Sequence, residues 1–148
     1  MPRASFTQRA LGRAIDIGLL CVLIVAALSG FVEDDANGDP RVDAPAWFLI
    51  ALAVAVLAFE SVPVRLRGQT LGKIITKTRI VRVVDGGRPG WGAALIRWGI
   101  AVAVLAVVGA FSPPAAIAAV AVLYASALID PNGRGLLDRA AGTEVVRT

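Results

Sequence analysis

The sequence predicts an all-α integral membrane protein with four membrane-spanning helices, at about 14–32, 46–64, 93–111 and 115–129. Two observations predict this fold class. First, 57% of the 148 residues are hydrophobic and 18% are charged, whereas a soluble chain usually carries about a quarter charged residues. Second, the apolar residues gather in runs that approach the roughly 17–25 residues needed to cross a bilayer. The length is that of one domain, so residues 1–148 are treated as a single transmembrane domain.

Each predicted span has a recognisable boundary or interruption. Asp16 interrupts the first run, Glu60 lies near the end of the second, and Arg97 lies near the start of the third. The fourth run is short and rich in alanine, and Ser112-Pro113-Pro114 separates it from the third. Because two prolines cannot continue a helix, this separator predicts a tight hairpin. Asp16 also fits a secretory signal poorly, so we expect the first span to be retained.

The loops between the spans differ in the sign of their charge. Residues 1–13 and 65–92 are strongly basic, whereas residues 33–45 carry five acids against Arg41 alone. Short cytoplasmic loops are enriched in lysine and arginine. We therefore expect a multi-pass protein of the bacterial inner membrane with both termini and the central loop cytoplasmic. Anionic lipid headgroups are the expected partner of the basic residues.

The central loop has the pattern of a short amphipathic helix. Leu71, Ile74 and Ile75 recur at helical spacing, and Lys73 and Lys77 occupy another face. Such a helix lies in the headgroup layer of a membrane. We expect lipid-headgroup or cap contacts from the four basic residues Arg65, Arg67, Lys73 and Lys77.

Two segments are rich in β-branched residues and resemble strands. Residues 79–84 end at the turn signal Asp85-Gly86-Gly87, and residues 143–147 form the second segment. Each would otherwise be an unpaired edge beside the membrane. We expect the two to pair as a small two-stranded cap on the cytoplasmic side.

Charged residues inside the spans predict a buried network. Asp16, Glu60 and Arg97 lie at one depth, about 5–6 Å below the same surface at 1.5 Å per residue. A lipid-facing charge is costly, so we expect these three to converge, with Arg13 and Asp138 above them. The planar fork of Arg97 can hold two carboxylates. Two interpretations stay open: an ion-pair staple that fixes helix packing, or a proton or cation site.

A glycine-rich stretch over 130–143 follows the last span. Its glycines allow close backbone turns. Asp138 within it is expected to cap the amides of a short turn or to pair with Arg13, Arg65 or Arg67. A plain connection to the terminal strand and a ligand contact are both compatible with this pattern.

Composition excludes several function classes. The chain has no histidine and one cysteine, Cys21, which excludes histidine bases, a disulfide within the chain and multi-cysteine metal sites. We therefore expect no enzyme activity, no metal and no cofactor. Residues 68–73 are not a phosphate-binding loop, because three residues separate the glycines and Ile74 follows the lysine. Nucleic acid is not expected as a partner, since the basic residues flank apolar spans and aromatic residues are few.

Four stretches together resemble the RDD family of small bacterial membrane proteins. They are Arg13-Ala14-Ile15-Asp16, Gly68-Gln69-Thr70-Leu71-Gly72-Lys73, Val83-Val84-Asp85-Gly86-Gly87 and Leu136-Leu137-Asp138-Arg139-Ala140-Ala141-Gly142-Thr143.

The resemblance implies that Arg13 is the family arginine and that Asp16 and Asp138 are its two aspartates. Glu60 resembles an acid found in some members, and Leu137 stands where many members have histidine. For function the resemblance implies transport of unknown ligands, with sodium–proton exchange in some members.

Two functional hypotheses follow. The first is a non-catalytic accessory or structural subunit of a larger bacterial membrane complex, since four short spans enclose little volume. The alternative is a small ion- or proton-coupled transporter that acts as a homo-oligomer, with Asp16 and Glu60 as carriers and Arg97 tuning them. Either hypothesis implies other membrane subunits or further copies of this chain as partners.

Overall fold

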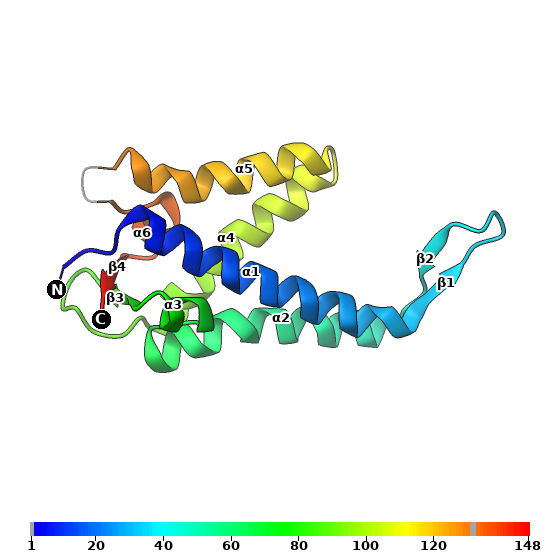
Figure 1. Cartoon of the computed structure of the whole chain (residues 1–148), viewed down its shortest axis with the longest axis horizontal. Coiled ribbons are helices and arrows are strands. Elements are labelled where there is room, and N and C mark those ends of the chain that lie inside the picture. Colours follow the sequence, from blue (N-terminus) through cyan, green and yellow to red (C-terminus); the bar gives the residue numbers. More distant parts are fainter. Residues whose placement is uncertain (1, 131–132) are drawn as a thin grey trace.

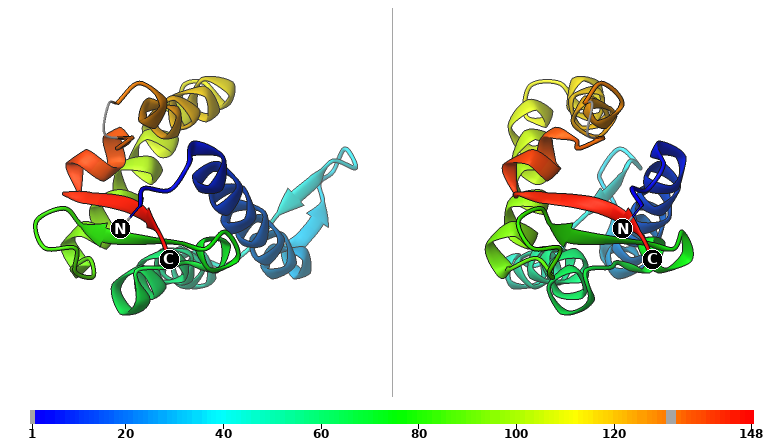
Figure 2. Two further views of the ribbon diagram at one scale, coloured as in Figure 1. Left: turned by 60° about the vertical axis from the view of Figure 1, so that its left-hand side comes forward. Right: turned by 90° about the vertical axis from the view of Figure 1, so that its left-hand side faces the viewer.

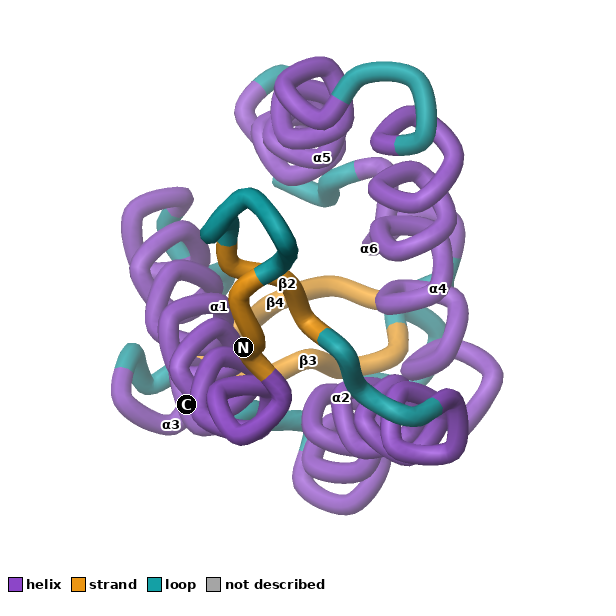
Figure 3. Tube along the Cα trace, turned by 90° about the vertical axis from the view of Figure 1, so that its right-hand side faces the viewer, coloured by secondary structure: helices purple, strands orange, loops and turns teal. Residues whose placement is uncertain are grey.

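Long helices run between two small sheets in the computed structural model, which describes residues 2–130 and 133–148 (Figure 1). The elements are α1 (Phe6–Leu28), η1 (Ser29–Phe31), β1 (Val32–Asp34), β2 (Pro40–Val42), α2 (Ala46–Arg67), α3 (Leu71–Ile75), β3 (Thr78–Arg82), α4 (Trp91–Gly109), α5 (Pro113–Ala125), η2 (Ser126–Leu128), α6 (Leu136–Ala140) and β4 (Thr143–Arg147). Both termini, α3, α6 and the β3–β4 sheet lie at one end, which we call the cap, and the β1–β2 hairpin projects at the other (Figure 1). Viewed end-on, α1, α2, α4 and α5 stand around the β3–β4 sheet (Figure 3).

Three helices are long and apolar enough to cross a membrane. They cover Phe6–Phe31, Ala46–Arg67 and Trp91–Gly109, and 6%, 17% and 12% of their most apolar windows are buried inside the protein. Helices whose apolar side chains face outward on most sides belong in lipid. The fourth apolar helix, Pro114–Leu128, is about 22 Å long at 1.5 Å per residue, against a hydrocarbon core of about 30 Å. Three of the four predicted segments are therefore candidate membrane-spanning helices, and the fourth forms a shorter helix whose crossing stays a prediction.

Helix α1 begins eight residues before the predicted start at residue 14. The Ser5 hydroxyl accepts from the Gln8 amide at 3.2 Å, and the Gln8 side chain accepts from the Ser5 amide at 3.2 Å. This reciprocal capping box satisfies amides that the first turn leaves free. As a result, Arg9 lies within the helix, one turn before Arg13.

Helix α2 begins at Ala46 as predicted and continues to Arg67, three residues beyond the predicted end. The next residue, Gly68, has φ +71°, a left-handed conformation that ends helices and favours glycine. A Cβ atom at Gly68 would also lie 2.7 Å from the carbonyl oxygen of Ile80. Gly68 thus ends α2 and allows β3 to approach it.

The hairpin predicted between the third and fourth apolar segments is confirmed. Helix α4 ends at Gly109, and Ser112 caps α5 by accepting from the Ala115 amide at 3.4 Å. The two prolines occupy the first turn of α5, where their missing N–H groups cost no helical hydrogen bond.

The predicted pairing of the two cap segments is also confirmed. Strands β3 and β4 are antiparallel, with Thr78 opposite Arg147 and Arg82 opposite Thr143, and Figure 2 shows them side by side. Strand β3 ends at Arg82 rather than at residue 84. There Arg82 contacts Asp85 at 2.5 Å and the chain turns.

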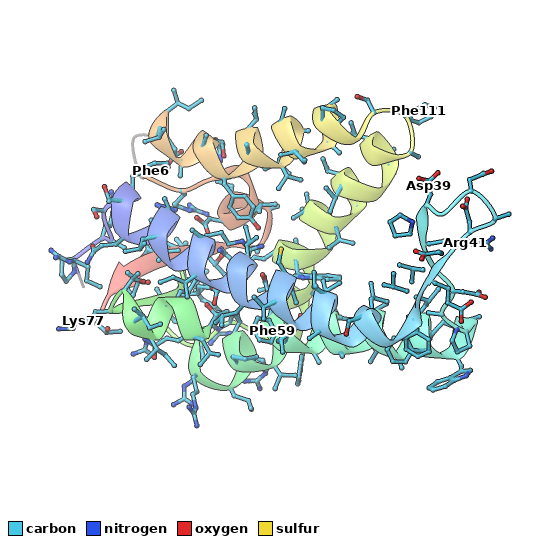
Figure 4. The ribbon with its side chains drawn as sticks, turned by 45° about the vertical axis from the view of Figure 1, so that its right-hand side comes forward. Phe6, Asp39, Arg41, Phe59, Lys77 and Phe111 are labelled. Carbon is cyan, nitrogen blue, oxygen red and sulfur yellow. The ribbon has the colours of Figure 1, made fainter. Side chains whose placement is uncertain are left out.

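The β1–β2 hairpin was not predicted; its residues were expected only as an acidic loop. Asp35 accepts from the amides of Asn37 and Asp39 at 2.8 and 3.0 Å, and Gly38 has φ +84°. The carboxylate therefore holds a tight turn that brings the two short strands together. Figure 4 places Asp39 and Arg41 at this end, and Lys77 at the cap end.

Candidate functional site

The charged side chains at the cap end of the helices form three groups. In the first, Arg13 on α1 donates from one terminal nitrogen to Glu60 on α2 and from the other to the Tyr124 hydroxyl on α5. Its guanidinium carbon lies 4.7 Å from the centre of the tyrosine ring, within the range of a cation–π contact. One arginine thereby joins three helices.

The second group centres on Asp138 of α6, which is buried. Its carboxylate accepts from Arg9 at 2.7 Å and from Arg97, and it caps α6 by accepting from the Gly135 amide at 3.2 Å. Arg97 also donates to the Thr143 hydroxyl at 2.8 Å. A single carboxylate here faces two guanidinium groups and ties α1 and α4 to the cap.

The third group centres on Asp16 of α1, which is fully buried. One carboxylate oxygen accepts from the Thr70 hydroxyl at 2.5 Å, and the other accepts from the Gly72 amide at 2.8 Å. The Lys73 ammonium lies 3.7 Å away. A Cβ atom at Gly72 would lie 2.0 Å from the carbonyl oxygen of Gly12. Asp16 therefore docks α3 directly against the backbone of α1.

The predicted pairing inside this cluster is wrong in part. Arg97 was expected to meet Asp16 and Glu60, but its ion pair among the described residues runs to Asp138. Arg13 and Asp138, expected together above the others, belong to different groups. The reason is that Arg13 donates a hydrogen bond to Glu60, while the Thr70 hydroxyl and the Gly72 amide donate to Asp16.

Two further expectations for Asp138 met different outcomes. It was expected to cap the amides of a turn, and it does so at the start of α6. The alternative expectation, an ion pair with Arg13, Arg65 or Arg67, is not met, because its described ion pairs are to Arg9 and Arg97.

Lys73 was predicted to contact lipid headgroups or the cap, but its side chain points into the protein. The side chain is buried beside Asp16. The reason is the close contact of α3 with α1, which turns this face of the short helix inward. Burial, with the charge of Arg13 acting in the same direction, lowers the pKa of Lys73 to about 8 although Asp16 opposes the shift.

The other three predicted headgroup or cap contacts lie nearer the surface. Arg67 and Lys77 are exposed, and Arg65 is partly buried. The Arg65 Nε atom is buried and has no hydrogen-bond partner among the described residues. Contact of these three with lipid stays a prediction.

A cavity of about 110 Å³ lies among these groups. It is lined from α1, α2, α3, α4, α5 and the cap by charged side chains of all three groups, and by apolar residues that include Leu137. Leu137 is buried, so an apolar side chain fills the place where the family resemblance leads one to expect histidine. Among residues 2–130 and 133–148, no three acidic or cysteine side chains come together as a metal site would require.

Sequence reasoning missed four residues of this site: Arg9, Thr70, Tyr124 and Thr143. A signal for Arg9 was present, because Ser5-x-x-Gln8 is a capping pattern that starts the helix before residue 9. The hydroxyl groups of the other three carry no local signal, since each meets its charged partner through tertiary contacts.

Comparison with protein-family models matches the model described as RDD family to residues 3–142. The match covers nearly the whole chain, including Arg13, Asp16 and Asp138. Comparison with curated proteins and with solved structures found no match.

Proposed function

Because this chain belongs to the RDD family and is a multi-pass membrane protein, we propose that it is a non-catalytic subunit of a larger bacterial membrane complex. In this proposal the buried ion pairs are staples that hold the cap on the spanning helices. The acidic hairpin is external, and the cap, with both termini, lies on the cytoplasmic side of the inner membrane.

The pairing of the three inner carboxylates carries the proposal. Glu60 and Asp138 are each held by arginine, and Asp16 is held by a hydroxyl, an amide and a lysine. An ion-carrying carboxylate has to release its partner in every cycle. Arginine stays charged at any physiological pH, so these pairs favour a permanent structural role.

The dimensions of the bundle favour partners. Three helices of spanning length and a shorter fourth leave little room for a private pathway in one copy. Gly18 on α1 and Gly99 on α4 have open space where a Cβ atom would lie. Small residues on exposed helix faces allow another helix to approach closely, which supports a neighbouring subunit within the membrane.

A small ion- or proton-coupled transporter acting as a homo-oligomer is the second candidate. The observation that favours it is the cavity at the cap end, which Glu60 helps to line. In that case Glu60 exchanges its proton or cation as Arg13 moves away.

Flux measurements distinguish the two functions. The purified chain is reconstituted in vesicles under a sodium and a pH gradient, and internal pH is followed with a dye. The structural proposal predicts flux equal to that of protein-free vesicles. Flux in the wild type that is lost in folded Glu60→Gln, but kept in the matched control Glu33→Gln on the exposed hairpin, would establish the transporter instead.

The accessory role has its own test. A photoreactive residue at Val22, which is exposed on α1, should crosslink to a distinct membrane protein in intact cells. The same residue at Val84, exposed beside the cap, is the control and should not. Crosslinks from position 22 to lipid or to second copies alone would contradict the accessory role.

A further inference from the structure

The cavity at the cap end has an excess of positive charge. Four cationic side chains line it, those of Arg9, Arg13, Lys73 and Arg97, against the two carboxylates of Glu60 and Asp138. Counting Asp16, which lies behind Lys73, still leaves four cations against three carboxylates. The four basic side chains are 11–19% exposed, so bulk water screens them weakly.

Some hydrogen-bond donors of these basic side chains also lack a close acceptor. Lys73 has its nearest acceptors at 3.4 Å, the Thr70 hydroxyl, and at 3.7 Å, the Asp16 carboxylate. Asp138 is shared by two arginines. The Nε atom of Arg13 is buried without a hydrogen-bond partner among the described residues. Because an uncompensated buried charge is costly, the cavity is suited to a further anion.

A nearby acid outside the cavity, Asp130, offsets part of this positive charge at Arg9, so the excess is confined to the side chains that line the cavity itself. Asp130 attracts the charge of Arg9, but it does not line the cavity. Its carboxylate faces Arg139 at 3.9 Å and accepts from the Arg134 amide at 2.8 Å.

We propose that this cavity binds one phosphate group, between the guanidinium groups of α1 and α4 and the ammonium of α3. A volume of about 110 Å³ holds several water molecules, and a phosphate group needs no more space. Guanidinium forks match two phosphate oxygens at once, and lysine adds a point charge. This assignment goes beyond the structural role proposed above and does not depend on it.

The phosphate group has two sources with the same chemistry: inorganic phosphate, or the phosphodiester of an anionic lipid. The cavity is lined by the candidate spanning helices and by the cap, so under the proposed topology it lies near the cytoplasmic headgroups. Phe6 and Ala10 of α1, together with Leu123 of α5 and Ala127 in the η2 turn that follows it, form an apolar side. The ends of these two helices lie on the same side of the sheet (Figure 2). An acyl chain is compatible with this side, so the lipid source is tested alongside the free ion.

Two binding measurements on the full chain distinguish the sources. In the first, protein in phosphatidylcholine nanodiscs is dialysed against radiolabelled inorganic phosphate. In the second, native mass spectrometry counts the phosphatidylglycerol molecules that remain on the detergent-solubilised protein, with phosphatidylcholine as reference. The test variant is Lys73→Gln and the matched control is Lys77→Gln, an exposed lysine four residues away.

We expect one saturable site for one of the two sources, with affinity at least about tenfold lower in Lys73→Gln because a charged hydrogen bond is lost. Lys77→Gln should bind as the wild type does. Absence of saturable binding from both sources, or equal weakening in the two variants, would overturn the assignment.

A measurement on the wild type keeps the test decisive if Lys73→Gln does not fold. A bound ligand raises the melting temperature in a saturable way. Inorganic phosphate should raise the melting temperature to a plateau that lies above the value in chloride at equal ionic strength. Phosphatidylglycerol should likewise raise it to a plateau above the value in phosphatidylcholine. A linear rise without a plateau in both series would refute the site.

Discussion

Asp138→Asn removes one negative charge from a carboxylate that two arginines share. Asparagine keeps the shape and one acceptor oxygen, so packing changes little. Arg9 and Arg97, whose side chains are 15% and 16% exposed, then lie together without their shared counter-charge. Removing one partner of a buried pair typically costs about 3–5 kcal/mol. Because both arginines keep some exposure, we expect the lower end, about 3 kcal/mol of unfolding free energy.

The matched control is Asp85→Asn in the turn after β3. Asp85 contacts Arg82 at 2.5 Å, but both side chains are about half exposed, at 49% and 50%. Such surface pairs contribute about 0–1 kcal/mol. Both substitutions remove one carboxylate charge from a close ion pair. They differ in burial and in the number of arginines, since Asp138 faces two and Asp85 faces one.

The assay is reversible unfolding in mixed micelles with a rising fraction of denaturing detergent, followed by the fluorescence of the three tryptophans. Asp138→Asn should lose at least about 2 kcal/mol more than Asp85→Asn, roughly a 30-fold difference in the unfolding constant. Adding Arg97→Leu to Asp138→Asn should recover part of the loss. Equal losses in the two single variants, within about 0.5 kcal/mol, would refute the claim that Asp138 compensates buried charge.

Three further predictions follow from the geometry. Gly72→Ala should destabilise the fold by more than about 2 kcal/mol, because the backbone of α1 leaves no room for the added methyl group. The control is Gly18→Ala, where the added methyl group would meet open space. Thermal melting in detergent measures both variants. Lys73 has a folded pKa of about 8, below its ordinary value, so the unfolded chain binds more protons between pH 8 and 10.5. Wild-type stability should therefore rise with pH across that window, by up to about 3 kcal/mol relative to Lys73→Met, and a flat difference would contradict the shift. Under the proposed topology, in which the basic loops are cytoplasmic, alkaline phosphatase fused within residues 33–45 should be active, whereas fusions at either terminus should be inactive.

Hydropathy was sufficient to predict the long helices, because helices with apolar residues on most sides appear in the sequence as long apolar runs. Such runs can be recognised without knowing the tertiary contacts. The start of α2 at Ala46 was predicted correctly for this reason. The β3–β4 pairing was also predicted, since two β-branched segments beside a membrane both need a partner. The fourth apolar segment was predicted over 115–129, and the structure has an apolar helix over Pro114–Leu128. That this shorter helix crosses the membrane stays a prediction.

The partners in the charge cluster could not be predicted in the same way. Equal depth fixes one coordinate of Asp16, Glu60 and Arg97 but does not say which way each helix face turns. Asp138 reaches Arg97 because α6 packs against α4, and no local sequence pattern predicts this tertiary contact. By contrast, the capping residues before Arg9 were a readable local signal, and using them would have placed that arginine beside the cluster.

The register of the cap sheet has a consequence for how the chain inserts. Strands β3 and β4 flank α4 and α5 in sequence, so they meet only when both lie on the same side of the bilayer. A chain in which α4 crosses and α5 fails to return would leave β4 stranded on the opposite side. Five paired residues on each strand would then lose their ladder. The sheet can therefore form only in chains whose two strands lie on the same side of the membrane, which under the proposed topology requires α5 to cross back after α4.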